Sequence, residues 1–205
     1  MDAEPRGAAT AEEVRLSAAE VARALSTRAA LFERLAGAAP EAVVRLARRY
    51  AATLERGGTL FFAGNGGSAA DAQHLATEYV VRFRATRRAF RAIALTTDSS
   101  LLTACGNDLG FAEVFARQIE ALAGPDDLVI LHSTSGDSPN VVRAAETARA
   151  RGVSVVGFLG RGGGAVRTLL DDAILVPSDD AAAVQEAHLA LEHLIVGLVE
   201  ELLAA

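Results

Sequence analysis

A histidine and a glutamate, His74 and Glu78, stand four residues apart directly after a glycine-rich stretch, in the segment GNGGSAADAQHLATE at positions 64–78. Residues at this spacing share one face of a helix. An imidazole and a carboxylate placed in this way can bind a metal ion or move a proton on a substrate. Exposed pairs without a function have the same spacing, so both alternatives stay open at this point.

The other histidines are His132, His188 and His193, and the last two lie with Gln185 in the segment VQEAHLALEHL. Gln185 and His193 are eight residues apart, which is about 12 Å of rise on a straight helix. One ion can bind both side chains only if they reach toward each other, if the helix bends, or if they come from different chains.

Two loops have the composition of a phosphate site. The stretch GNGGS at 64–68 can turn tightly and present backbone N–H groups at the start of a helix. The stretch STSGDS at 133–138 places hydroxyl groups just before a helix that Pro139 can begin. Glycine and serine are also common in turns and helix caps, so each loop alone fits a purely structural role equally well.

Two nucleotide-binding motifs are excluded. A dinucleotide fingerprint needs a third glycine where Ala69 stands, and a P-loop needs a Gly-Lys-Ser/Thr sequence that the chain lacks. We therefore expect any bound phosphate to belong to a ligand simpler than a nucleotide.

The composition indicates a folded chain of 205 residues, 51% hydrophobic and 22% charged. The net charge of −6 argues against a nucleic-acid partner, and the short basic stretch from Arg82 to Arg91 suits an anionic small molecule. One cysteine, Cys105, cannot form an intrachain disulfide. With no apolar signal core and no run of about 18 apolar residues, the sequence predicts a cytoplasmic protein without a membrane segment.

Short apolar runs alternate with helical stretches after residue 58, which predicts an α/β fold with a five-stranded parallel sheet flanked by helices. The expected strands are 59–64, 91–96, 127–133, 153–160 and 172–177, and a last helix spans about 181–203. Both glycine- and serine-rich loops follow predicted strands, at the edge of the sheet where such folds bind ligands.

Residues 10–56 are predicted to be helical. Thr10 and Glu13 fit a capping box, Pro40 begins a second helix, and Gly57 and Gly58 end it. We expect one domain over 1–205, with an N-terminal helical extension over 1–57 and an α/β core with the C-terminal helix over 58–205.

The ordered motifs GNGGSxxDAQHxxxE, TTD, GND, STSGxS and QExHxxxxH resemble those of the phosphoheptose isomerases, members of the sugar isomerase (SIS) fold. The resemblance covers nearly the whole chain, and the ordered set is specific although each motif alone is weak. It implies a flavodoxin-like, three-layer fold. It also implies an aldose–ketose isomerase that interconverts sedoheptulose 7-phosphate and D-glycero-D-manno-heptose 7-phosphate through an enediol, the first step toward nucleotide-activated heptose.

The resemblance also implies a set of site residues. Glu78 and His193 would be the catalytic acid and base, and one Zn²⁺ per active site would be bound by His74, Glu78, Gln185 and His193. A labile bond from Glu78 to the metal is expected, because a tightly held ligand cannot also act as a free base. The implied sugar-phosphate contacts are Asn65, Gly66, Ser68, Arg82, Asp98, Ser133, Thr134, Ser135, Ser138 and Gln185.

Three positions depart from the family pattern. Ala183 stands where many members carry an arginine, Ala181 where a small hydroxyl is common, and His132 where an apolar residue is usual. His132 is then either a strand residue or an additional site group. The apolar last helix and the family's usual tetramer predict a homotetramer with each active site lined by more than one subunit.

Two non-catalytic alternatives stay open. SIS-fold relatives that bind the replication initiator share SAADAQH and ALTTD but lack the residues equivalent to Glu78 and His193. A regulator that senses a sugar phosphate would need a DNA-binding segment, and none is evident in the sequence. The presence of both Glu78 and His193 favours the enzyme.

Overall fold

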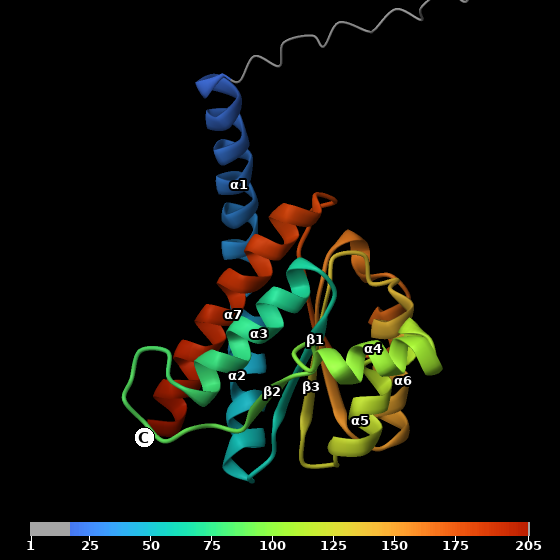
Figure 1. Cartoon of the computed structure of the whole chain (residues 1–205). Coiled ribbons are helices and arrows are strands. Elements are labelled where there is room, and N and C mark those ends of the chain that lie inside the picture. The colour runs from blue at the N-terminus through green and yellow to red at the C-terminus, as the bar shows by residue number, and fades with distance from the viewer. Residues whose placement is uncertain (1–16, 205) are drawn as a thin grey trace, which may run out of the picture.

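The computed structural model describes residues 17–204 and contains a five-stranded parallel sheet in the order β2-β1-β3-β4-β5 (Figure 1). The strands are β1 (Leu60–Gly64), β2 (Ala92–Ala94), β3 (Leu128–Ser133), β4 (Ser154–Leu159) and β5 (Asp172–Leu175). The helices are α1 (Ala18–Ala38), α2 (Pro40–Glu55), α3 (Gly67–Val80), α4 (Ser99–Asp108), α5 (Ala116–Leu122), α6 (Pro139–Ala150) and α7 (Ala181–Ala204), with short 3-10 turns at Phe111–Glu113, Arg161–Gly163 and Ala165–Leu169.

The central strand is β3, which pairs with β1 on one side and β4 on the other. All six of its residues are buried, as are all five of β1. Strands of a parallel sheet are covered on both faces, so they carry continuous apolar runs rather than alternating ones. This explains why apolar runs located the central strands, while the edge strands β2 and β5 are only partly buried.

Helices α2, α3 and α7 cover one face of the sheet, and α4, α5 and α6 lie on the other (Figure 1). Successive side chains of a strand point to opposite faces. Phe62 therefore packs with Tyr50 and Phe158 in the core beneath α2, α3 and α7. Its neighbour Phe61 packs with Ile119 in the second core, beneath α5 and α6.

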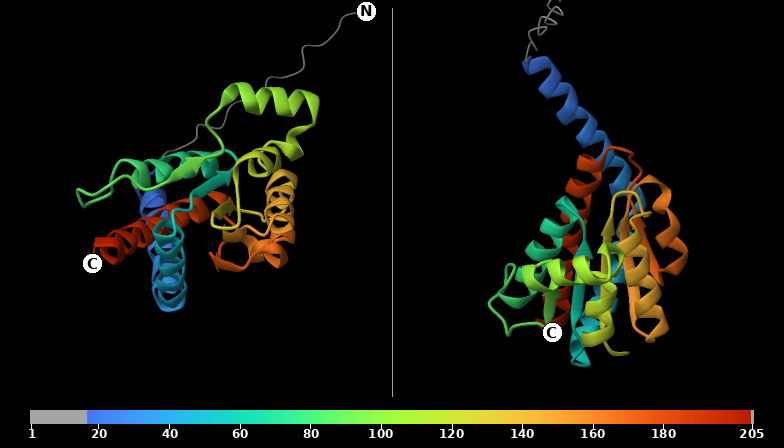
Figure 2. Two further views of the ribbon diagram at one scale, coloured as in Figure 1. Left: turned by 90° about the horizontal axis from the view of Figure 1, so that it is seen from below. Right: turned by 45° about the vertical axis from the view of Figure 1, so that its right-hand side comes forward.

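Helix α1 runs outward from the body of the molecule (Figure 2). Its N-terminal capping box is formed by Ser17 and Glu20, while the predicted box at Thr10 and Glu13 lies outside the described residues. Only Leu31 and Leu35 of this helix are buried. Most of α1 therefore makes little contact with the rest of its own chain.

The five predicted strands and the long C-terminal helix are confirmed, with end points within three residues of the prediction. The second helix begins at Pro40 as expected. This helix, α2, is part of the main core, because Leu46 and Tyr50 are fully buried in it. The feature that projects from the fold is α1 alone.

Within residues 17–204, no helix combines the length and the apolar character needed to cross a membrane.

Candidate active site

The chain reverses direction across the sheet between β1 and β3. From β1 it passes to β2 at the edge, and β3 then returns to the other side of β1. Such a switch point opens a crevice beyond the carboxyl ends of the two strands. Asn65, directly after β1, and Asn140, in the first turn of α6, exchange two amide hydrogen bonds of 2.8 Å across this point. The pair joins the two loops that the sequence marked as phosphate sites.

The loop after β1 approaches α7 closely at the start of α3. Gly66 has a φ of +57°, a left-handed conformation that favours glycine. A Cβ on Gly67 would lie 2.5 Å from Oε1 of Gln185, so a larger residue there would displace the Gln185 amide. Ser68 is buried at 2% exposure and sits within the first turn of α3.

The loop after β3 has two of its hydroxyls in internal hydrogen bonds. Ser133 Oγ accepts a bond from the N–H of Gly136 at 2.9 Å, and Ser135 Oγ accepts one from the N–H of Asp137 at 3.2 Å. Ser138 occupies the N-cap of α6 in an extended conformation, but its side chain makes no capping bond. The Ser138 hydroxyl therefore remains available at the start of α6, where Pro139 has no N–H to donate.

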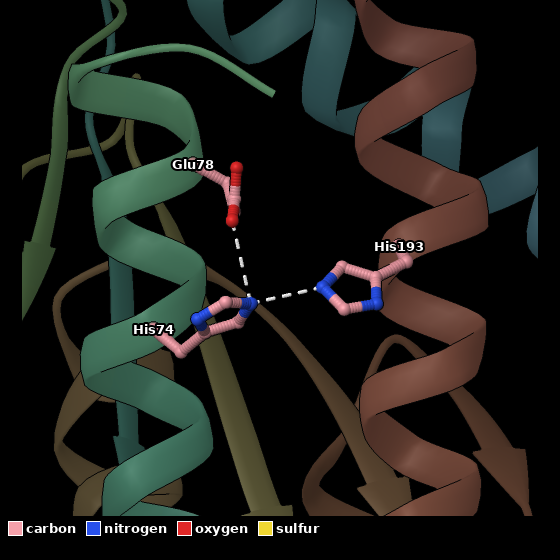
Figure 3. Close-up of side chains that lie close together, drawn as sticks. All are labelled: His74, Glu78 and His193. Atoms are coloured by element: carbon pink, nitrogen blue, oxygen red, sulfur yellow. Dashed lines mark hydrogen bonds and ion pairs between the residues drawn. The ribbon is translucent and has the colours of Figure 1, made fainter. Parts of the chain in front are cut away.

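The imidazoles of His74 and His193 and the carboxylate of Glu78 meet between α3 and α7 (Figure 3). The two Nε2 atoms are 2.9 Å apart, and His74 Nε2 is 3.3 Å from Glu78 Oε1. One ligand atom from each residue lies within 4.8 Å of the others. The His74 side chain is 45% exposed and that of Glu78 is 17% exposed, so a ligand can reach the cluster.

This cluster suits a zinc ion. Two histidines and a carboxylate are a known ligand set of catalytic zinc, which keeps a fourth position open for water or substrate. Two nitrogens on one tetrahedral zinc lie roughly 3.3 Å apart, given bonds of about 2.0–2.1 Å. The imidazoles of His74 and His193 would therefore separate only slightly to admit the ion.

Gln185, the fourth predicted ligand, lies at the other end of α3. Its amide packs against Gly67, which precedes His74 by seven residues, or about 10 Å of helix rise. Glu78 and His193 meet within one chain, so their contact does not require a second subunit. The role of Gln185 as a metal ligand stays a prediction.

Two further predicted contacts, Asp98 and Arg82, are not members of the cluster of His74, Glu78 and His193. Asp98 is the N-cap of α4, where its Oδ1 accepts a bond of 2.9 Å from the N–H of Leu101. Arg82 is exposed, two residues past the end of α3.

Two other positions have their own surroundings. Thr134, a predicted phosphate contact, is half-buried in the loop after β3. Ala183 is buried in the core at 4% exposure.

His132 does not join the cluster; it is fully buried on β3. Its Nε2 lies 3.2 Å from Glu192 Oε1, the same oxygen that accepts a bond of 3.1 Å from the hydroxyl of Tyr50. The imidazole stacks between Phe62 and Phe158, with ring centroids 6.3 and 5.2 Å away. Of the two alternatives for His132, the structure supports the strand residue, held in a buried polar network.

Two more titratable groups have shifted pKa values, His188 on α7 and Asp71 on α3. Burial lowers the pKa of His188 to about 3, with His132 adding to the effect, so His188 is a neutral imidazole. Burial is also the main cause that raises the pKa of Asp71, against the opposing effect of His132 and His74. Asp71 is not among the predicted site residues, although it belongs to the DAQH motif. Its position three residues before His74, one helical turn away, is the sequence signal that could have identified it.

The SIS domain family model matches residues 25–160. Since this is well over half of the chain, the protein belongs to the SIS domain family. The chain is 50% identical to the phosphoheptose isomerase of Pelobacter propionicus over 186 residues, which cover 91% of this chain and 98% of that one. It is 52% identical to the phosphoheptose isomerase of Solidesulfovibrio magneticus over 190 residues, covering 93% and 91% of the two chains. Within the SIS domain family, the chain is thus a member of the phosphoheptose isomerases.

Solved structures support the same placement. A phosphoheptose isomerase from Francisella tularensis superposes with a TM-score of 0.88 at 33% identity, over 91% of this chain and 99% of that one. One from Neisseria gonorrhoeae gives 0.85 at 35% identity, over 89% and 98%. Both the SIS fold and the family predicted from the sequence motifs are confirmed.

Proposed function

We propose that this chain is an aldose–ketose isomerase that converts sedoheptulose 7-phosphate to D-glycero-D-manno-heptose 7-phosphate through an enediol. One observation carries the proposal: Glu78 and His193, on two different helices, bring a carboxylate and an imidazole to one accessible point. Membership of the phosphoheptose isomerase family supports the choice of substrate. The non-catalytic alternatives give no reason for this meeting of acid–base groups.

The loops at the switch point are proposed to hold the phosphate. The N-terminal ends of α3 and α6 favour an anion through their helix dipoles, and the uncapped Ser138 hydroxyl adds a donor. His74 and Glu78 lie two to three helical turns after the start of α3 at Gly67. This distance separates the proposed phosphate site from the reacting carbons. A seven-carbon chain phosphorylated at one end and isomerised at the other needs such a separation.

The proton transfers are assigned to the two residues that meet. Glu78 takes a proton from C1 of the ketose and returns it to C2, and the enediol exists between these steps. His193 gives a proton to the oxygen on C2 and receives one from the oxygen on C1. The substrate's net composition is unchanged, and both side chains end in the states in which they began.

We propose that Zn²⁺ is held by His74, Glu78 and His193, whose geometry suits it, with Gln185 as the remaining family ligand. When bound, such an ion stabilises the negative charge that develops on the substrate oxygens. His74 acts only as a ligand in this scheme, and its position between Glu78 and His193 fixes both groups relative to the substrate.

We also propose a homotetramer in the cytoplasm. An apolar groove of about 560 Å³ runs between α1, α2 and α7, and the exposed Phe32, Val44 and Leu194 lie along it. Such a groove and the outward-running α1 provide surfaces that a second copy can cover. The lone free cysteine, Cys105, suits a reducing compartment. An active preparation with a monomeric mass in light scattering would contradict the assembly.

The central test is incubation of the purified protein with sedoheptulose 7-phosphate while aldose formation is followed. We expect turnover that a chelator abolishes and Zn²⁺ restores, with unphosphorylated sedoheptulose as the control substrate. No aldose from the zinc-loaded protein would remove the isomerase proposal. Turnover that resists the chelator would remove only the metal.

A further inference from the structure

The ring of Phe83 lies flat against the imidazole of His193. The ring centroids are 5.4 Å apart and the planes differ by 13°. His74 meets the same imidazole edge-on, with centroids 5.1 Å apart and planes at 78°. The imidazole is thus held on one face by a hydrocarbon ring and at Nε2 by another histidine. Stacked rings at this separation attract each other, so rotation of the His193 ring is disfavoured.

The segment that carries Phe83 is fastened to α7 by Glu200. The carboxylate of Glu200 accepts bonds from the backbone N–H groups of Phe83, Arg84 and Ala85 at 3.0, 2.9 and 2.9 Å. Its side chain is 4% exposed, so water competes little for these bonds. Glu200 stands two turns after His193 on α7 and on the same face. One helix therefore carries both the imidazole and the group that fixes the ring over it.

The space beneath the Phe83 ring is provided by Gly197. This residue lies one turn after His193, and a Cβ added to it would stand 3.6 Å from Cε1 of Phe83. That distance is ordinary van der Waals contact, so a side chain larger than alanine would crowd the ring. The ring therefore lies directly over the face of α7 formed by His193, Gly197 and Glu200.

Arg87 extends the same fastening to α3. Its Nε donates to Glu200 Oε1 at 3.1 Å, and its Nη2 and Nη1 donate to the backbone carbonyls of Glu78 and Tyr79 at 2.7 and 2.8 Å. The guanidinium also lies 4.0 Å from the centroid of the Phe90 ring. One ion pair thus ties the end of α3, at Glu78, to the helix that carries His193.

We propose that Phe83 is a positioning residue: its ring, fixed by Glu200 and Arg87, orients the His193 imidazole so that Nε2 points to the place shared with His74 and Glu78. Phe83 does not itself exchange protons, because its ring has no titratable group. Its function is to keep His193 ready for proton transfer before substrate arrives. The kinetic consequence rests on the proposed isomerase function, but the orientation of the imidazole does not.

The test compares three variants. Phe83→Leu removes the flat ring but keeps an apolar side chain, and Phe83→Tyr keeps the ring. Phe111→Leu is the matched control, because Phe111 is 62% exposed and lies on the other side of the sheet. We expect Phe83→Leu to lower kcat by roughly 10- to 100-fold with KM within about twofold, since a small misplacement of a catalytic group has costs of this order. Phe83→Tyr and Phe111→Leu should retain nearly full kcat.

A spectroscopic measurement on the metal-free protein provides the second readout. The ring-current shifts of the His193 imidazole protons, assigned by their absence in His193→Ala, should be lost in Phe83→Leu and kept in Phe83→Tyr. Unchanged kcat in Phe83→Leu, or a raised KM with unchanged kcat, would overturn the positioning role. If the wild-type protein has no isomerase activity, the proposed function fails, and the imidazole shifts alone decide whether Phe83 orients His193. Shifts that do not differ between wild type and Phe83→Leu would then overturn it.

Discussion

Two neighbouring residues of α7, Glu192 and His193, take part in two different imidazole–carboxylate groups. His193 is half-buried and meets His74 and Glu78 where α7 packs against α3, a place that we call the seam. Glu192 is fully buried and meets His132 and Tyr50 beneath the same helix. Successive residues of a helix point about 100° apart, so one short segment serves both environments. The same side-chain types therefore give a reactive group where a ligand can enter and a structural group where it cannot.

The difference lies in what surrounds the charged atoms. At the seam, the Glu78 carboxylate and two imidazoles are within reach of solvent, and substrate or metal can complete their coordination. In the core, Glu192 receives two donors on one oxygen, while Oε2 has no partner among the described residues. A buried carboxylate is costly without partners, so His132 and Tyr50 are needed there for stability. The two groups should therefore respond differently to substitution.

The largest expected effect is the loss of activity in Glu78→Gln. Removing a general base typically costs about 10²- to 10⁴-fold in kcat. Because Glu78 keeps some contact with solvent and Gln has nearly the same size, we expect little change in the free energy of unfolding. The measurement is initial aldose formation together with urea denaturation, and Glu146→Gln on α6 is the control. Turnover close to that of wild type would remove Glu78 from the mechanism.

The buried group predicts the opposite result. His132→Leu leaves the Glu192 carboxylate with Tyr50 as its only donor, and breaking such a buried pair costs about 3–5 kcal/mol of stability. The activity of each folded molecule should change little. Urea denaturation measures the first effect, and kcat per folded protein measures the second. A loss of stability under about 1 kcal/mol would show that Glu192 finds another partner.

The pair can also be removed as a whole. His132→Leu combined with Glu192→Leu replaces both polar groups by apolar ones of similar size, and buried pairs replaced in this way often regain stability. We expect the double variant to be more stable than His132→Leu alone, by about 1–3 kcal/mol. A double variant less stable than the single one would show that Glu192 stabilises the fold by means other than His132.

The sequence predicted the seam better than the core, for physical reasons. Apolar runs and helical spacing located the strands of the buried sheet, and the spacing of His74 and Glu78 placed both side chains on one helix face. The ordered motifs then added His193. Spacing says nothing about contacts between distant segments, so the pairing of His132 with Glu192 and the fastening of Phe83 by Glu200 could not be predicted. Both depend on how α7 packs against β3 and against the segment after α3.

A smaller effect is expected at the phosphate loop. Ser135→Ala with Ser138→Ala removes two hydroxyls near the start of α6, and hydrogen bonds to a charged group contribute about 1.5–3 kcal/mol. Binding of the sugar phosphate should fall at least about tenfold. Binding of the unphosphorylated sugar, measured by the same calorimetric titration, should be nearly unchanged. Equal losses for both ligands would place the phosphate elsewhere.

The smallest effect is expected from Glu200, another carboxylate of α7, and it is lost at acidic pH. Burial tends to raise the pKa of Glu200, but the N–H donors of Ala85, Arg84 and Phe83 and the charge of Arg87 lower it overall. Its folded pKa therefore lies below the ordinary value of 4.5. The stability it contributes is fully present above about pH 4.5 and is lost as the pH falls through the lower, folded pKa. Glu200→Gln should thus be less stable than wild type at neutral pH, and the difference should shrink on acidification below this value. Urea denaturation from pH 7 to pH 3 measures it, and a constant difference over that range would show that the carboxylate is not ionised when it holds Phe83.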